Sequence, residues 1–203
     1  LKPAQFLKIL EKKLSNVGIT RLGDISHFTP LAVPVVQACR PFIYSHSSVG
    51  QNSGCQGKGY SQAQAKVSCI MESIEDFCLE PRNPNLIRAT YRFLSRTHLA
   101  LDPLCFSVCK TAPYPPGHDE PLMWMKSVSL STGKDYYLPA ELIFFPFYPT
   151  DYQTKSFFPG GSNGTAAGAS YQDAVTAALY EVIERHYFYQ WETKPKTSVK
   201  GLF

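Results

Sequence analysis

The sequence lacks any apolar run close to the roughly 20 residues that a membrane-spanning helix needs. It also lacks blocks of like charge: the net charge is only +4, and basic residues are spread along the chain. The N-terminal segment LKPAQFLKILEKKL has the pattern of a charged amphipathic helix and not of a signal peptide. We therefore expect a soluble, cytoplasmic protein without a membrane or nucleic-acid partner.

Paired cysteine motifs are missing as well. The six cysteines form no C-x-x-C pair, so we expect reduced thiols. Cys105, Cys109 and His98 are metal-ligating residue types, but their spacing is generic and a zinc site is disfavoured. The chain also has no Walker A loop, because Lys58 in GKG is followed by glycine where that motif requires Ser or Thr. A P-loop NTPase is thereby excluded.

Composition favours one globular domain over residues 1–203, since 44% of the 203 residues are hydrophobic and 18% are charged. Periodicity and turn residues predict helices, strands and loops in irregular order. The expected helices are 4–16, 61–79 and 171–191, the strands 18–26, 34–44 and a strand–turn–strand over 121–142, and the loops 45–59 and 159–170. Because there is no regular βα period, we expect an α+β fold with mixed or antiparallel sheets and long acidic helices.

Two of these helices carry the same acidic pattern. In the segment 59–76 a glycine loop precedes a serine near the helix start, and Glu72 and Glu75 follow about three turns later. The segment 168–185 can be laid over it without a gap and repeats the pattern with Glu181 and Glu184. One such pair is usually a plain surface feature, but two matching copies favour a shared role.

Four convergent carboxylates would repel one another, and a divalent cation relieves that repulsion. Oxygen ligands favour Mg²⁺, which in proteins often accompanies nucleotide phosphates. Lys58, which lies between two glycines, and Arg185 could supply positive charge to those phosphates.

Four segments together resemble the YcaO family. They are GITRLGDIS with PVVQACRP, GKGYSQAQAKVSCIMESIED, YYLPAEL, and SNGTAAGASYQDAVTAALYEVIER. The resemblance covers about residues 13–190 and implies a YcaO-type fold that binds ATP and Mg²⁺ between the two acidic helices. It also implies an enzyme that uses ATP to activate a backbone amide of a peptide or protein, which yields an azoline (the cyclodehydratase reaction), a thioamide or an amidine.

The resemblance also implies roles for particular residues. Glu72, Glu75, Glu181 and Glu184 correspond to the Mg²⁺ ligands. Ser68 and Arg185 correspond to nucleotide contacts, Lys58 lies in a loop that approaches phosphate, and Ser162 and Asn163 line the same pocket or form a tight turn. The expected partners are a peptide or protein substrate and a separate recognition protein, and a homodimer is a candidate assembly.

The sequence departs from the family pattern in three respects. Asp76 stands where the family's first motif usually has Arg, and the second motif carries Ala166, Ala169, Asp173 and Ala177 where many members have polar groups. Further nucleotide contacts beyond the second acidic helix are expected of the family, so the domain is expected to be incomplete at its C-terminus. The alternative is therefore a non-catalytic YcaO-like module that binds a nucleotide or a peptide and needs a partner chain.

Overall fold

The computed structural model describes residues 2–41, 52–82, 84–147 and 156–193. Its elements are, in chain order, α1 (Pro3–Leu10), the 3-10 helix η1 (Glu11–Val17), β1 (Arg21–Asp24), η2 (Ser26–Phe28), β2 (Val35–Pro41), β3 (Asn52–Lys58), α2 (Gln62–Leu79), β4 (Leu86–Thr90), α3 (Tyr91–Leu94), η3 (Pro103–Cys105), β5 (Pro121–Val128), β6 (Asp135–Pro139), η4 (Ala140–Leu142) and α4 (Tyr171–Thr193). None of these helices combines the length and apolarity needed to cross a bilayer.

The chain forms two compact units, residues 1–162 and 163–203. The first unit contains two antiparallel sheets of three strands each, in the orders β1-β2-β3 and β4-β5-β6. The second contains a glycine-containing loop and α4. This mixture of helices and antiparallel sheets confirms the α+β class expected from the sequence.

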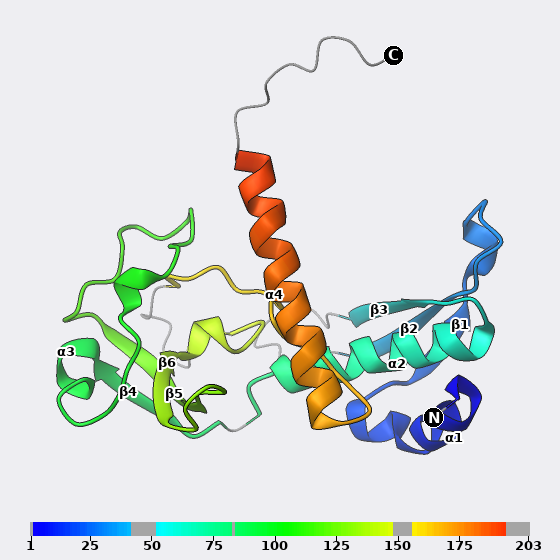
Figure 1. Cartoon of the computed structure of the whole chain (residues 1–203), viewed down its shortest axis with the longest axis horizontal. Coiled ribbons are helices and arrows are strands. Elements are labelled where there is room, and N and C mark those ends of the chain that lie inside the picture. Colours follow the sequence, from blue (N-terminus) through cyan, green and yellow to red (C-terminus); the bar gives the residue numbers. More distant parts are fainter. Residues whose placement is uncertain (1, 42–51, 83, 148–155, 194–203) are drawn as a thin grey trace, which may run out of the picture. The chain divides into compact units, whose positions relative to one another are not determined.

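Helix α2 packs along one face of the sheet β1-β2-β3 (Figure 1). The residues of α2 that are most deeply buried are small, namely Ala65, Cys69 and Ser73, and they follow one another at intervals of four. This spacing places them on one stripe, which allows close approach to the strands. Larger apolar residues lie beside this stripe: Ile70 is fully buried, and Val67, Met71 and Ile74 pack against the same core.

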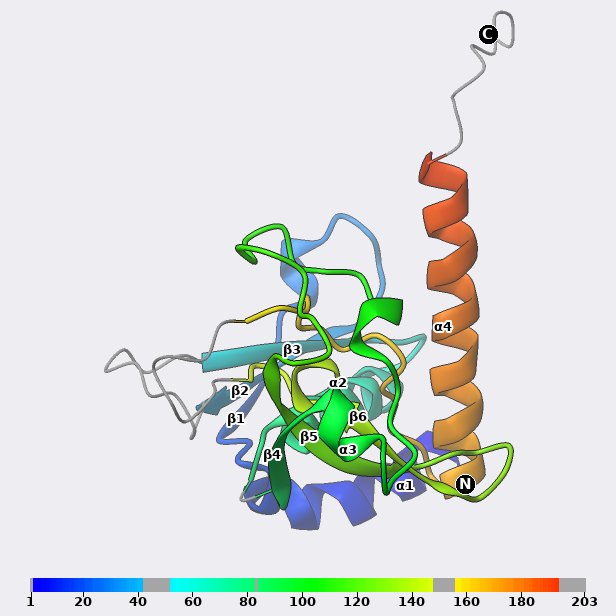
Figure 2. The same cartoon turned by 90° about the vertical axis from the view of Figure 1, so that its left-hand side faces the viewer.

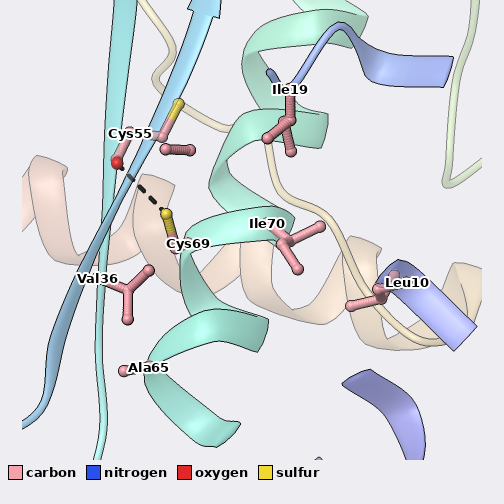
Figure 3. Close-up of a cluster of buried hydrophobic side chains, with 8 residues drawn as sticks. Leu10, Ile19, Val36, Cys55, Ala65, Cys69 and Ile70 are labelled. Atoms are coloured by element: carbon pink, nitrogen blue, oxygen red, sulfur yellow. Dashed lines mark hydrogen bonds between the residues drawn. The ribbon is translucent and has the colours of Figure 1, made fainter. Parts of the chain in front are cut away.

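Figure 3 shows the resulting core, in which Leu10 of α1 and Ile19 meet residues of α2, β2 and β3. Cys69 Sγ donates a hydrogen bond to the carbonyl oxygen of Cys55 at 3.3 Å across the interface between α2 and β3. Cys69 is therefore a small residue of the core. Cys78, near the end of the same helix, is exposed.

The prediction of a loop over 45–59 was wrong for its second part, since residues 52–58 form β3 and pair with β2. Residues 45–51 lie outside the described part of the chain. The segment NSGCQGK was not recognised as a strand because its inward positions carry Cys55 and Gly57 in place of large β-formers. A Cβ on Gly57 would lie 2.1 Å from both the carbonyl oxygen of Ala65 and the backbone N of Cys69, so only glycine fits where β3 crosses α2.

The helix expected over 4–16 begins as the α-helix α1 and continues as the 3-10 helix η1, and Gly18 in the left-handed conformation ends it. The strand–turn–strand over 121–142 is confirmed as β5 and β6, with Gly133 at positive φ in the turn. The region 83–112, which the sequence left unassigned, contains β4, α3 and η3 among its described residues. Figure 2 shows β4, β5 and β6 side by side, with α3 following β4.

The second sheet has its own core, which Trp124 dominates. Trp124 is fully buried and donates from Nε1 to the carbonyl oxygen of Ala89 on the neighbouring strand at 2.9 Å. Phe157 and Phe158, which come from the segment after β6, complete this cluster. The aromatic residues near the end of the first unit therefore belong to a packed core and not to a plain connecting loop.

Candidate site on the acidic helix

The candidate site in the first unit is built on α2, whose start is fixed by its N-cap. Ser61 accepts a hydrogen bond from the backbone N–H of Gln64 at 3.3 Å. This confirms the serine cap expected behind the glycine loop. From that start, Ser68 and Glu72 lie one turn apart on the exposed side of the helix, and Glu75 follows in a half-buried position.

Strand β3 holds the first of these carboxylates in place. The backbone N–H of Gln56 donates to Oε2 of Glu72 at 3.1 Å. Lys58 lies two residues further along the same strand, close enough for its charge to act on Glu72. Sequence reasoning had placed Lys58 and Glu72 in one site but had missed Gln56, because a backbone donor leaves no signature in the amino-acid pattern.

The pKa of the Glu72 carboxyl is raised above its ordinary value. The largest cause is partial desolvation where the carboxylate lies against β3, and the negative charge of Asp76 adds to it. The hydrogen bond from Gln56 and the charge of Lys58 act in the opposite direction. The ionised form of Glu72 is thus held at a cost in free energy, which a bound cation would offset.

Asp76, which departs from the pattern described above, has a structural partner in this chain. Its Oδ2 accepts a hydrogen bond from Cys55 Sγ at 3.2 Å, and Cys55 is buried in β3. This contact joins the last turns of α2 to the middle of the strand. An arginine at position 76 could not accept this hydrogen bond, because a guanidinium carries only donors.

In the second unit, the start of α4 is capped as the sequence predicts. Ser170 accepts from the backbone N–H of Asp173 at 3.2 Å and donates to its carboxylate at 2.8 Å. The loop before the cap folds back on the helix, since a Cβ on Gly164 would lie 2.9 Å from Cγ2 of Val182. Asn163 is exposed at the beginning of this unit, and Ser162 is exposed at the end of the first unit.

The acidic pair on α4 lies in a more open setting. Glu181 is half-buried, and its Oε1 lies 3.7 Å from Nη2 of Arg185 one turn later. Glu184 is exposed. Arg185 keeps 61% of its side chain exposed, so its guanidinium remains accessible to an anion. The two carboxylates and the arginine lie within two turns of one another on this helix.

The residues present fit a magnesium ion by their chemistry, because Mg²⁺ prefers carboxylate oxygen and is commonly held by one or two protein carboxylates together with phosphate oxygens. Each helix offers one such pair. Across the described residues, however, no group of three or more His, Cys, Asp or Glu side chains is close enough to hold a metal ion. This statement includes Cys105, Cys109 and His98.

A family model, curated proteins and solved structures all show similarity to this chain. A family model described as YcaO cyclodehydratase, ATP- and Mg²⁺-binding, matches residues 56–200. An uncharacterized protein of Methanothermobacter thermautotrophicus is 29% identical over 204 residues, which cover 98% of this chain and 49% of that protein. The chain thus spans about half the length of this curated relative. Its match to an uncharacterized protein of Mycobacterium tuberculosis covers 38% of that protein.

Two solved structures establish the fold. The YcaO protein of Methanopyrus kandleri bound with AMPPCP and Mg²⁺ superposes with a TM-score of 0.69 at 24% identity, over 95% of this chain and 45% of that one. A heterocyclase in complex with substrate and cofactor superposes with a TM-score of 0.68 at 24% identity, over 89% of this chain and 27% of that one. At this level of identity the likeness concerns the fold alone.

Proposed function

The chain belongs to the YcaO family, and we propose that it serves an ATP- and Mg²⁺-dependent enzyme that activates a backbone amide of a peptide or protein substrate. The observation that carries the proposal is the setting of Glu72. This carboxylate is partly desolvated, oriented by the Gln56 N–H, and placed one turn from Glu75 and close to Lys58.

In this proposal Glu72, Glu75, Glu181 and Glu184 supply the carboxylates for Mg²⁺. Lys58 and Arg185 neutralise phosphate charge, and Ser68, Ser162 and Asn163 contact the nucleotide. Bound Mg²⁺–ATP would supply the phosphoryl group and the charge neutralisation that phosphoryl transfer requires. The contribution of the protein is then positioning: Gln56 fixes the rotamer of Glu72, and the cap at Ser61 fixes the start of α2.

The product class is an azoline, a thioamide or an amidine, according to whether the attacking nucleophile is a neighbouring side chain, sulfide or an amine. The similarity to the heterocyclase in complex with substrate and cofactor concerns the fold, so all three products stay in the proposal. A separate recognition protein and a homodimer remain part of the proposal.

A second candidate function is nucleotide or peptide binding without turnover. The contact between Asp76 and Cys55 favours it, because the residue that stands in place of the family's Arg is used here to join α2 to β3. The two functions differ in one measurable product. Peptide-stimulated release of ADP or phosphate supports the enzyme, and saturable ATP binding without release supports the binding module.

The deciding experiment is calorimetric titration of the chain with ATP, with and without Mg²⁺, for the natural sequence and for Glu72→Gln and Glu184→Gln. Glutamine at position 72 still accepts the hydrogen bond from Gln56 but carries no charge. We expect Mg²⁺-dependent binding to be abolished in both variants. Glu11→Gln, which changes an exposed glutamate whose carboxylate lies 4.0 Å from Lys66, is the matched control and should bind normally.

Thermal unfolding supplies an independent reading of the same binding. A ligand at 100 times its Kd stabilises the folded state by about 2.7 kcal/mol, and this stabilisation should require both Mg²⁺ and Glu72. Unchanged affinity in Glu72→Gln and Glu184→Gln would contradict the metal assignment.

A further inference from the structure

A small aromatic pocket lies outside the acidic helix, in the part of the first unit that follows β6. Its walls are the rings of Phe144, Phe145, Phe147 and Phe158, and Glu141 stands at its side; we call it the phenyl pocket. Its volume is about 160 Å³. An engineered protein cavity of about 150 Å³ accepts benzene, so the phenyl pocket has room for the end of one side chain.

The walls of the pocket are held by packing. Phe158 is 2% exposed and makes an edge contact with Phe106, with their ring centroids 6.0 Å apart. Phe144 is 9% exposed and lies nearly parallel to Phe147, with centroids at 6.2 Å. Rings packed in this way form a fixed apolar lining, and phenyl rings attract cations that lie over their faces.

The two carboxylate oxygens of Glu141 differ in their hydrogen bonds. Its Oε2 accepts from Phe157 N at 2.8 Å, from Phe158 N at 3.0 Å and from Ser156 Oγ at 3.3 Å. Its Oε1 accepts no hydrogen bond from any residue that the structure describes. A glutamine would supply the same acceptor for the segment 156–158. The negative charge of Glu141 is therefore not needed to hold that segment.

The phenyl pocket is joined to the acidic helix. The backbone N–H of Phe145 donates to the carbonyl oxygen of Leu79, the last residue of α2, at 3.0 Å. Leu79 lies four residues after Glu75, which is about 6 Å along the helix axis. A chain that passes Glu75 could therefore place a neighbouring side chain in this pocket.

We propose that the phenyl pocket binds the alkylammonium side chain of a lysine in the peptide substrate. The aromatic walls accommodate the methylene stem and attract the charge, and the open Oε1 of Glu141 accepts from the ammonium group. A guanidinium pairs best with two parallel oxygens, and here Oε2 already has three donors, so the site selects lysine over arginine. This inference rests on the proposed function, because it takes the substrate to be a peptide.

The first test uses n-butylammonium as a lysine side-chain probe and n-butanol as its neutral counterpart, each titrated into the full chain and followed by amide chemical shifts. We expect saturable, millimolar binding of butylammonium, seen at Phe144, Phe145, Phe157 and Phe158, and at least about tenfold weaker binding of butanol. Equal binding of the two probes, or no response at these amides, would overturn the proposal.

Three variants sharpen this test. Glu141→Gln keeps the acceptor for Phe157 and Phe158, so it should retain its melting temperature and lose the preference for butylammonium. Gly160→Ala is the second variant, since its Cβ would lie 2.8 Å from Cδ2 of Phe145 and displace a wall of the pocket; it too should weaken binding. Glu11→Gln changes an exposed acid whose carboxylate lies 4.0 Å from Lys66 and which does not line the pocket, so it should bind as the natural sequence does.

Competition by short peptides separates this proposal from the proposed function. Ac-Gly-Gly-Lys-Gly-Gly-NH2 should compete with butylammonium, and the same peptide with norleucine for lysine should not. Butylammonium and lysine binding in a chain that binds no Mg²⁺–ATP would uphold the pocket and contradict the proposed function. Mg²⁺–ATP binding without discrimination between lysine and norleucine would reject the pocket alone.

Discussion

Gln56 and Glu72 are joined by a hydrogen bond of 3.1 Å from the backbone N–H of the strand to Oε2 of the helix residue. This contact orients the carboxylate, but it also draws it toward β3 and away from water. Because desolvation is the largest cause of the raised pKa of Glu72, the charged form destabilises the folded chain when no cation is bound. The strand thus orients the carboxylate at the expense of stability, and in the proposed function a bound cation would offset that cost.

The first prediction concerns Glu72→Gln in the absence of Mg²⁺ and nucleotide. The folded-state pKa of Glu72 lies above its unfolded value, so its carboxyl contributes a penalty that is absent at acid pH and grows as pH rises through both values. Glu72→Gln should therefore melt at a higher temperature than the natural sequence near pH 7.5. This difference in melting temperature should disappear at about pH 4. Scans at both pH values check this, with Glu11→Gln as control.

A lower melting temperature for Glu72→Gln at neutral pH would contradict this prediction. It would mean that the charge of Glu72 stabilises the empty chain, as an ordinary ion pair with Lys58 would. The pH dependence separates this case from simple loss of packing, because only the titration of the carboxyl closes the gap at acid pH.

The second prediction concerns the crossing of β3 over α2. Gly57→Ala should destabilise the fold by about 3 kcal/mol or more, because its Cβ would collide with helix backbone that cannot move aside. Gly23→Ala in β1 is the matched control, since a Cβ there meets nothing within 4 Å. It should be neutral or slightly stabilising. Urea unfolding of both variants measures the difference, and equal stabilities would refute the close approach.

The third prediction concerns a buried ion network beside this core. Arg40 and Glu80 are 1% and 2% exposed and form an ion pair, and Glu80 also accepts from Arg82 at 2.5 Å. Nε and Nη2 of Arg40 have no hydrogen-bond partner within the described ranges. Glu80→Gln should therefore cost about 3–5 kcal/mol, because it leaves a buried guanidinium without its counter-charge.

Chemical denaturation of Glu80→Gln measures this cost. The double variant Arg40→Met with Glu80→Leu replaces both charges by apolar groups and should recover much of the lost stability. A double variant as unstable as Glu80→Gln alone would show that shape, and not the unpaired charge, is responsible.

The fourth prediction concerns the six free thiols. Burial raises the pKa of Cys69 to about 11, and Cys55 is also buried, so neither should react with a disulfide reagent in the native chain. The other four should react: Cys39, Cys78, Cys105 and Cys109. The hydrogen bond with Thr111 lowers the pKa of Cys109, so Cys109 should supply the fastest phase near pH 7.5.

Labelling kinetics with and without denaturant check this order. Cys109→Ser should remove the fastest phase and leave the rest unchanged. Thr111→Val should slow that phase, because it removes the hydrogen bond that favours the thiolate. Rapid labelling of Cys69 in the native chain would contradict its place in the core.

Local pattern predicted the elements that local forces determine. The N-caps at Ser61 and Ser170 and the turn at Gly133 depend on residues within a few positions of one another. Strand β3 was missed because its inward positions are cysteine and glycine, and these residues make a strand only where the small face of α2 approaches. Whether this segment forms a loop or a strand is therefore decided by its tertiary contact with α2.

The same division applies to the candidate site. The residue types and spacing of Glu72, Glu75, Glu181 and Glu184 could be read from the amino-acid sequence alone, because a repeated pattern at helical spacing is a local property, and the roles of these residues remain predictions. Only the tertiary structure decided what surrounds Glu72: a backbone donor from Gln56, the desolvation that raises its pKa, and an Asp76 engaged with Cys55. These effects arise where β3 meets α2, and contacts between segments distant in the chain leave no periodic trace in its sequence.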